Sequence, residues 1–250
     1  NTVGITGPKT NFVGSMLISN DAGTGTLNAA SNNTGFGNEV FDDLTSGDSN
    51  TAVGSAALAK LTTAGENTAV GASALGANTS GAANTALGIN ALFANTTAAN
   101  NTAVGRSSLE GNTTGTSNTA VGKDALQGNT TADNNTAVGY AALEANTTGT
   151  ENTSVGADAM QTSVTGNYNV AVGGNALFAA NGADSNTGIG YNALAATTTG
   201  EFNTAVGSAA LATNTTADNN TAVGRNALLV NTTGHTNVAV GALALDANTT

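Results

Sequence analysis

Few residues of this chain are of the types that carry out catalysis. His235 is the only histidine, and no nucleophile and carboxylate accompany it in an arrangement typical of a catalytic triad. The acidic residues, such as Asp124 and Glu144, are scattered and show neither paired-carboxylate spacing nor the pattern of a calcium loop. There is no cysteine to act as a nucleophile or as a thiolate metal ligand. The sequence therefore predicts no enzyme activity, no cofactor and no metal site.

A 17-residue repeat dominates the chain. An asparagine begins a near-copy of the same phrase thirteen times without a change of register, from Asn33 to Asn237. Numbered from this asparagine as slots 1 to 17, the consensus is Asn-Thr-Ala-Val-Gly-x-x-Ala-Leu-x-x-Asn-Thr-Thr-Gly-x-x. Such a period indicates units that are stable only when stacked on their neighbours. We therefore predict an N-terminal transition segment, residues 1–32, followed by thirteen repeats over residues 33–250, the last of them truncated.

Each repeat contains signals for a strand, a turn and a short helical segment. Slot 4 is always apolar and mostly β-branched, which favours a short strand whose slot 4 side chain is buried. Slot 5 is always glycine, as expected where φ is positive or another backbone lies too close for a Cβ. Slots 8 and 9 are nearly always Ala-Leu, which predicts one or two helical turns. Two adjacent repeats represent these structural positions: Asn101, Val104, Gly105, Leu109, Asn118, Val121, Gly122 and Leu126.

Stacked in register, the repeats predict a mainly β, solenoid-like rod. The slot 1 asparagines would form a ladder in which side-chain amides hydrogen bond from one coil to the next. Slot 15 alternates between glycine and alanine over part of the array, so a structural unit of one repeat and a unit of two repeats are both open.

The thin repeats also predict association between chains. One valine and one leucine per repeat bury too little apolar surface to offset the ordering of the whole repeat. The alanine at slot 3, expected on the strand face opposite to an inward-facing valine, suits close packing against another chain. We favour a homotrimer among the possible assemblies.

The surface suggests which partners to expect. The net charge of −11 is spread over the array and argues against nucleic acid as a partner. No apolar run approaches the roughly 18 residues that span a bilayer, so no membrane insertion is expected. Slot 6 is the most varied surface line and the candidate contact for a host-surface glycan or receptor. Its candidate residues are Arg106, Lys123, Tyr140, Tyr191 and Arg225.

Two further features belong to slots 12 to 14. Asn-x-Thr/Ser triplets are formal glycosylation acceptors, although asparagine and threonine are also what a turn requires. The triplets begin at Asn78, Asn95, Asn112, Asn129, Asn146, Asn214, Asn231 and Asn248. The Thr-Thr pairs raise a second hypothesis, a row of stacked threonines that orders water as some ice-binding proteins do. Val164 and Gly182 interrupt that row.

The repeat phrase, almost intact at residues 101–115, 135–149 and 220–234, resembles repeats of bacteriophage tail fibre proteins, marine ones in particular, and of related bacterial surface fibres. The resemblance covers about residues 33–250. The phrase is distantly similar to the head repeats of trimeric autotransporter adhesins, which are shorter and lack the Ala-Leu segment. The resemblance implies a fibrous, usually trimeric protein of the virion surface or extracellular space.

The function implied by this resemblance is that of a structural shaft, which extends a receptor-binding tip for host attachment and has no catalytic residues. Two alternatives stay open. One is an extracellular bacterial adhesin that binds surface glycans along its shaft through slot 6, and the other is an ice-binding solenoid.

Overall fold

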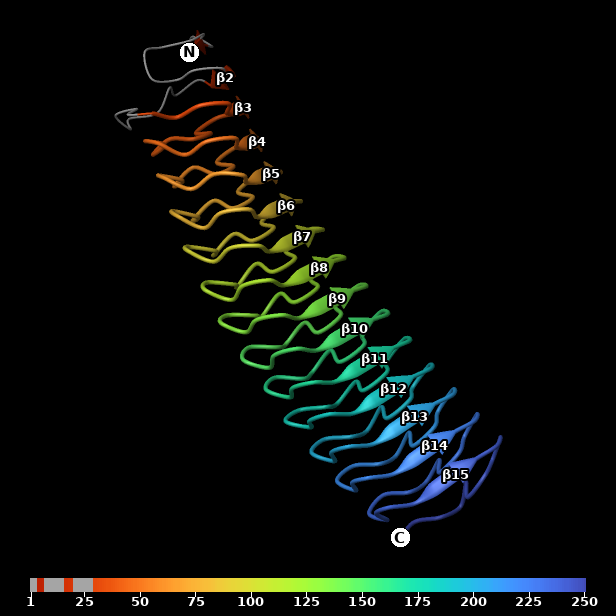
Figure 1. Ribbon diagram of the computed structural model, residues 1–250. Helices are drawn as coiled ribbons and strands as arrows, with labels where there is room; N and C mark the ends of the chain where they lie inside the picture. The colour runs from red at the N-terminus through yellow and green to blue at the C-terminus, as the bar shows by residue number, and fades with distance from the viewer. Residues whose placement is uncertain (1–3, 7–15, 20–28) are drawn as a thin grey trace. The chain divides into compact units, whose positions relative to one another are not determined.

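Each half of the chain is a β-solenoid in which one 17-residue repeat makes one coil (Figure 1). The computed structural model describes residues 4–6, 16–19 and 29–250. The chain divides into two compact units, Asn1–Asp124 and Ala125–Thr250. The described residues of both units contain strands and turns but no helix.

The strands of the repeats are parallel, and paired strands come from consecutive repeats. Val104 pairs with Val121 in the first unit, and Val206 pairs with Val223 in the second. The coil is therefore a single repeat, as the asparagine period predicts, and not a pair of repeats. The first unit contains β1 Gly4–Thr6, β2 Met16–Ser19, β3 Thr34–Phe36, β4 Thr51–Val53, β5 Thr68–Val70, β6 Thr85–Leu87, β7 Thr102–Val104 and β8 Thr119–Val121. The second contains β9 Thr136–Val138, β10 Thr153–Val155, β11 Val170–Val172, β12 Thr187–Ile189, β13 Thr204–Val206, β14 Thr221–Val223 and β15 Val238–Val240.

The N-terminal segment contributes one strand to the solenoid before the repeats begin. Strand β2 is parallel to β3, with Leu17 opposite Gly35, while β1 is antiparallel to β2. Leu17 is buried and fills the place where other coils have a slot 3 alanine side chain. A Cβ on Gly35 would lie 2.7 Å from Cδ1 of Leu17, which explains why this first repeat has glycine at slot 3.

The predicted orientation of the strands is wrong. The slot 3 alanines, such as Ala103 and Ala205, are completely buried, whereas the slot 4 side chains are half-buried or exposed, with 38% exposure at Val70 and 57% at Phe36. The cause is the narrow interior of the coil, which already holds the buried slot 9 leucine. At Gly188, a slot 3 position, an added Cβ would lie 3.3 Å from Cγ of Leu177 in the preceding coil. Only a small slot 3 side chain fits opposite that leucine.

The predicted helical turn at the Ala-Leu segment is also wrong. Slots 7 and 9 have positive φ, with 56° at Ser107 and 50° at Leu109. A right-handed helix requires successive negative φ values, so this segment is a pair of left-handed corners. The slot 9 amide bonds between coils, as Leu126 N donates to Ala142 O at 3.0 Å, while the slot 8 amide closes a turn within the coil, as Ser108 N donates to Gly105 O at 3.4 Å. Leucine tolerates this backbone because its side chain is one of the large buried groups of the core.

A third left-handed corner lies at slot 17, where relief of strain can be measured. Ala83 has φ of 56° and is half-buried. Because the left-handed region costs an L-residue about 1–2 kcal/mol and glycine about nothing, Ala83→Gly is expected to raise the free energy of unfolding by about 0.5–1 kcal/mol. Ala94→Gly, at a half-buried slot without positive φ, should lower it by a similar amount. Chemical denaturation followed by circular dichroism measures both, and destabilisation by Ala83→Gly would contradict the strained corner.

Candidate functional site

The interior of the coils is held together by a ladder of slot 1 asparagines. The side chain of each one bridges to the next coil: Oδ1 of Asn186 accepts from the backbone N of Asn203 at 2.9 Å and from its Nδ2 at 3.1 Å. Nδ2 of Asn203 also donates to Ala217 O at 2.8 Å. From Asn33 to Asn220 these asparagines are buried, so the ladder satisfies polar groups that would otherwise be costly inside the protein. The predicted ladder is confirmed in both units.

A second ladder runs through slot 12. In the first unit, Nδ2 of Asn95 donates to Oδ1 of Asn78 at 3.1 Å and to Ala98 O at 3.0 Å. The asparagines of the Asn-x-Thr/Ser triplets are completely buried at Asn78, Asn95, Asn112, Asn129, Asn146, Asn214 and Asn231. Their burial favours the structural role over that of glycosylation acceptors.

In the second unit the slot 12 ladder is interrupted at Ser163, Ala180 and Thr197. The shorter side chains do not reach the neighbouring asparagine, and Oδ1 of Asn146, Oγ of Ser163 and Oγ1 of Thr197 have no hydrogen-bond partner in the described structure. Unsatisfied buried side-chain atoms thus lie at and beside this interruption, and a fourth among the described residues is Nδ2 of Asn237 in the last coil.

The representative structural residues chosen from the sequence occupy different parts of the coil. Asn101, Asn118, Leu109 and Leu126 are buried, while Gly105 and Gly122 form the turn after the strand, both with φ of 138°. Val104 and Val121 lie on the outer strand face and are half-buried. Their stacking in adjacent strands is as predicted, but they do not belong to the interior.

The candidate side chains at slot 6 are exposed, as the hypothesis of a contact line requires. Arg106 and Lys123 belong to the first unit, and Lys123 Nζ lies 2.5 Å from Oδ2 of Asp124. In the second unit, Tyr140, Tyr191 and Arg225 are exposed too.

The three candidate side chains of the second unit do not converge on one point. Tyr140 and Tyr191 are three coils apart, about 14 Å at the usual spacing of about 4.8 Å between strands. The structure thus gives a line of separate side chains along the second unit.

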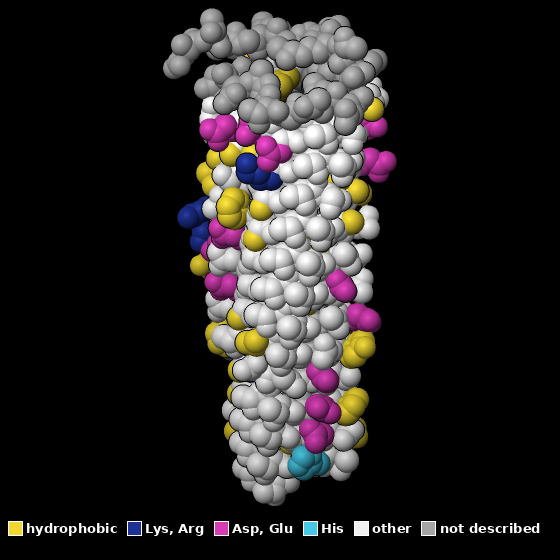
Figure 2. All heavy atoms as spheres, turned by 90° about the vertical axis from the view of Figure 1, so that its left-hand side faces the viewer, with side chains coloured by type: hydrophobic (Ala, Val, Ile, Leu, Met, Phe, Trp, Pro, Cys, Tyr) yellow, Lys and Arg dark blue, Asp and Glu magenta, His cyan; other side chains and the backbone are white. Residues whose placement is uncertain are grey.

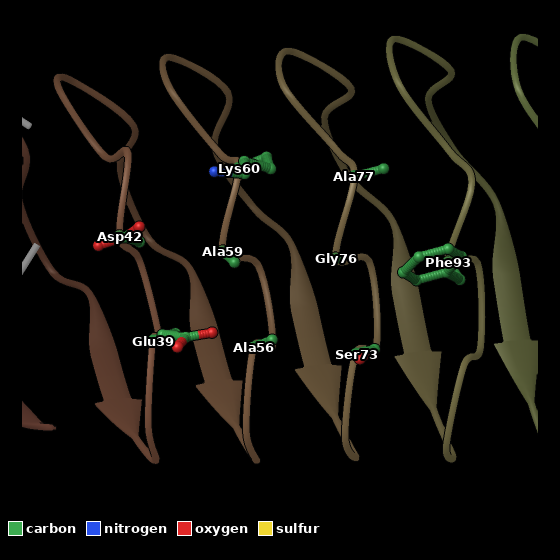
Figure 3. A pocket seen from close by; sticks show the side chains of 9 residues that line it. All are labelled: Glu39, Asp42, Ala56, Ala59, Lys60, Ser73, Gly76, Ala77 and Phe93. Carbon is green, nitrogen blue, oxygen red and sulfur yellow. The ribbon is translucent and has the colours of Figure 1, made fainter. Parts of the chain in front are cut away.

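A shallow trough in the first unit was not predicted from the sequence. It has a volume of about 300 Å³ and crosses the coils that contain β3, β4, β5 and β6 (Figure 3). Acidic residues and Lys60 line one end, Phe93 lines the other, and alanine, serine and glycine line the part between. The available signal was the series of side chains at slot 10 in consecutive repeats: Asp42, Ala59, Gly76 and Phe93.

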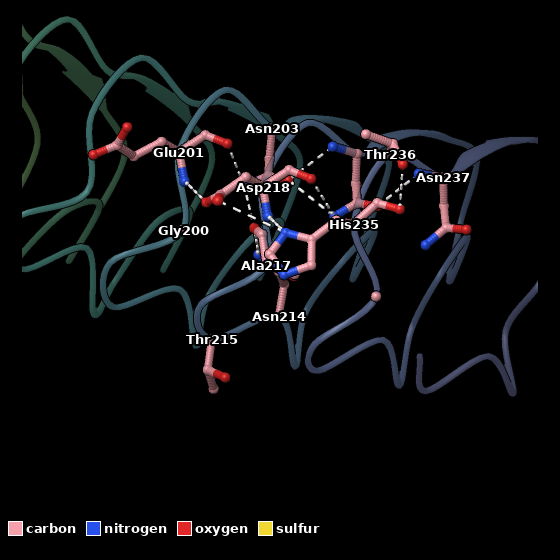
Figure 4. A network of polar contacts seen from close by, with 12 residues as sticks. Gly200, Glu201, Asn203, Asn214, Thr215, Ala217, Asp218, His235, Thr236 and Asn237 are labelled. Atoms are coloured by element: carbon pink, nitrogen blue, oxygen red, sulfur yellow. Dashed lines mark hydrogen bonds and ion pairs between the residues drawn. The ribbon is translucent and has the colours of Figure 1, made fainter.

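His235 belongs to a column of polar contacts at slot 16 of the second unit (Figure 4). Oδ1 of Asp218 accepts from the backbone N of Glu201 at 2.8 Å, and Nδ1 of His235 accepts from the backbone N of Asp218 at 2.9 Å. Nδ1 of His235 also lies 3.7 Å from Oδ2 of Asp218. In Figure 2 this histidine, the only one of the chain, lies at the end of a line of acidic side chains. Asp218 and His235 each cap an amide of the neighbouring coil, which is a structural role.

Other observations bear on the remaining hypotheses. Within the described residues, no group of three His, Cys, Asp or Glu side chains is placed to hold a metal ion. A search of the same residues finds no helix that is long and apolar enough to cross a membrane. The slot 13 threonines use their hydroxyls between coils, as Oγ1 of Thr79 donates to Thr96 O at 3.0 Å. The slot 13 hydroxyls are therefore engaged within the protein, whereas slot 14 threonines such as Thr131 and Thr148 are exposed.

Comparison of the chain with protein-family models, with curated proteins and with solved structures finds no match.

Proposed function

We propose that this chain is the structural shaft of a fibre on a virion or cell surface, which holds a receptor-binding tip away from the particle for host attachment. The observation that supports this function best is the repetition of one coil, with the same internal ladders and the same glycine turn, along each unit. A spacer needs a fold that lengthens by adding identical units, and a solenoid does so because each coil depends only on its neighbours.

The location is open to a direct experiment. Antibodies raised against this chain should label extended fibres on the surface of virions or cells of the source when viewed by immunogold electron microscopy. Labelling confined to the cell interior would reject the proposal. A glycan array tests the adhesin alternative: binding that is lost in Tyr140→Ala and Arg106→Ala variants would favour it, whereas equal binding or none leaves the role of a spacer.

We further propose that shafts associate as homotrimers, through the outer strand face. This face contains mostly threonine at slot 2 and valine, leucine or isoleucine at slot 4, and it has no charged residue from Thr51 to Val121 or from Thr136 to Val240 on those two slots. Its apolar side chains are half-buried or exposed, including Ile189 at 39%. An uncharged, β-branched surface on a chain with a net charge of −11 is typical of an interface between chains. The slot 3 alanines, which the sequence suggested as the packing surface for another chain, are buried inside the coil and cannot contact a second chain.

Substitutions on the outer strand face of the second unit test whether the chains associate through this face. The wild-type protein is expected to sediment with three times the monomer mass of 24.0 kDa. The triple variant Val155→Glu, Val172→Glu and Ile189→Glu should sediment as a monomer, because three carboxylates per chain would be forced together in the interface.

The control for that experiment places the same charges elsewhere. Thr131→Glu, Thr148→Glu and Thr199→Glu change exposed threonines at slot 14 of the same unit and should leave the trimer intact. A wild-type protein of monomer mass that still unfolds cooperatively would show that the chain needs no partner.

A further inference from the structure

We propose that the trough in the first unit is a binding site for a neutral saccharide of one or two rings. This inference is independent of the role as a shaft, since a fibre can be a spacer with or without such a site. It is also distinct from the slot 6 line, because slots 7, 10 and 11 supply its lining residues.

The trough exists because two consecutive coils lack a large slot 10 side chain. The coils that follow it have Glu110, Gln127 and Glu144 at this slot, whereas Ala59 and Gly76 leave the surface open. The open stretch lies between Asp42 and Phe93, three coils apart, or about 14 Å at the usual strand spacing of about 4.8 Å. That length and the volume of about 300 Å³ fit a small ligand of one or two rings.

Phe93 forms one end wall of the trough. This residue is 43% exposed, and its ring extends back toward Gly76 (Figure 3). A Cβ on Gly76 would lie 3.4 Å from the ring, so the glycine provides the space that the ring partly covers. An exposed aromatic ring beside small side chains gives an apolar surface for the C–H groups of a sugar ring.

The other end of the trough carries polar groups that suit hydroxyls. The carboxylates of Glu39 and Asp42 can accept hydrogen bonds from two hydroxyl groups. Lys60 can donate to a hydroxyl oxygen, and its Nζ lies 3.2 Å from Oδ2 of Asp43, which balances its charge. Charged groups strengthen such hydrogen bonds compared with neutral partners.

This combination selects among ligand classes. Two carboxylates disfavour phosphates, nucleic acid and acidic sugars. A purely apolar ligand would gain nothing at the acidic end, and a peptide strand would find backbone groups already engaged, since Ala77 N donates to Phe93 O at 3.1 Å. A neutral sugar has both an apolar C–H surface and several hydroxyls, so it can use both ends.

Saturation-transfer NMR with a defined set of ligands tests the proposal on the full chain. The probes are glucose, galactose, N-acetylglucosamine and lactose, with N-acetylneuraminic acid as the acidic sugar and choline as the cation. At least one neutral sugar should bind the wild type, and its affinity, measured by titration, should fall at least about tenfold in Phe93→Ala.

A second variant fills the middle of the trough, and its glutamine at position 76 displaces the ring of Phe93 from the space above Gly76. Ala59→Gln with Gly76→Gln introduces the residue that slot 10 has at Gln127 and Gln161, so the coil is known to accommodate it. This variant should also lose sugar binding, while its midpoint of unfolding in denaturant should equal that of the wild type. Phe178→Ala is the matched control, because Phe178 has the same slot but follows Gln161 instead of a glycine, and it should bind like the wild type.

Three outcomes would overturn the proposal. They are the absence of binding by every neutral sugar, equal binding by wild type and Phe93→Ala, and binding of choline or N-acetylneuraminic acid in place of the neutral sugars.

Discussion

Replacement of Gly173 by alanine is expected to unfold the coils around it, whereas the same replacement at the next residue, Gly174, should have little effect. Gly173 is a slot 5 glycine with φ of 129°, and an added Cβ would lie 2.7 Å from the carbonyl carbon of Gly190 in the following coil. The neighbouring coil can move away only if the strand pairing between β11 and β12 is lost. The expected loss in free energy of unfolding is about 4 kcal/mol or more.

Gly174 is the matched control for this change. The nearest atom to its added Cβ is in the ring of Tyr191 at 3.5 Å, an ordinary contact, and its φ is not positive. Gly174→Ala should therefore stay within about 1 kcal/mol of the wild type and can be slightly more stable, since alanine restricts the unfolded chain. Urea unfolding monitored by circular dichroism compares the two, and similar stabilities would refute the close approach of adjacent coils at slot 5.

Much of this fold could be predicted because the repeat is redundant. Because the thirteen copies keep one register, each slot stacks on the same slot of the next repeat, whatever the shape of the coil. The parallel pairing, the asparagine ladder and the glycine turn depend only on that condition. The asparagine ladder and the glycine turn were predicted correctly for this reason, and the parallel pairing is the form that stacking in register takes.

The direction of the strand side chains depends on the width of the coil, which hydrophobicity alone does not reveal. A strand of three residues offers only one alternation, so valine could be assigned to either face. Variation in size was the better signal. Slot 3 contains only alanine, glycine or serine, as at Gly35 and Ser154, whereas slot 4 accepts Phe36, Leu87 and Ile189. A crowded interior would not accept side chains of such different sizes, whereas the outer surface does.

The left-handed corners were missed because leucine and alanine favour helices when neighbours do not intervene. In this solenoid hydrogen bonds between coils take the place of helical ones, and such a bond holds Leu126 in a conformation that its own preference opposes. The trough was missed for a different reason. Its residues are small or ordinary one by one, and only the stacking of four coils places Asp42, Ala59, Gly76 and Phe93 side by side.

Removal of a ladder asparagine is the second change with a large expected effect. Asn203→Ala deletes the acceptor of the backbone N of Asn220, at 3.0 Å, and the donor to Ala217 O, at 2.8 Å. Both groups would remain buried without their partner, and each such group costs about 1–3 kcal/mol. We expect the variant to lose about 3–6 kcal/mol, measured by urea unfolding. Asn203→Leu should be similarly unstable although it leaves no cavity, since the hydrogen bonds are lost in both.

Asn181→Ala is the control for these variants, because Asn181 is exposed at slot 13, and it should change the stability by less than about 0.5 kcal/mol.

Asn203→Asp tests the contribution of the Nδ2 donor of Asn203. A buried aspartate that faces the carbonyl oxygen of Ala217 would have a raised pKa, because burial and that oxygen both disfavour its charged form. With a folded pKa above the unfolded value of about 4, the variant is most stable relative to the wild type below about pH 4 and loses stability as the pH rises toward 7. A variant that is as stable as the wild type at pH 7 would mean that the Nδ2 group of Asn203 does not hold the coils together.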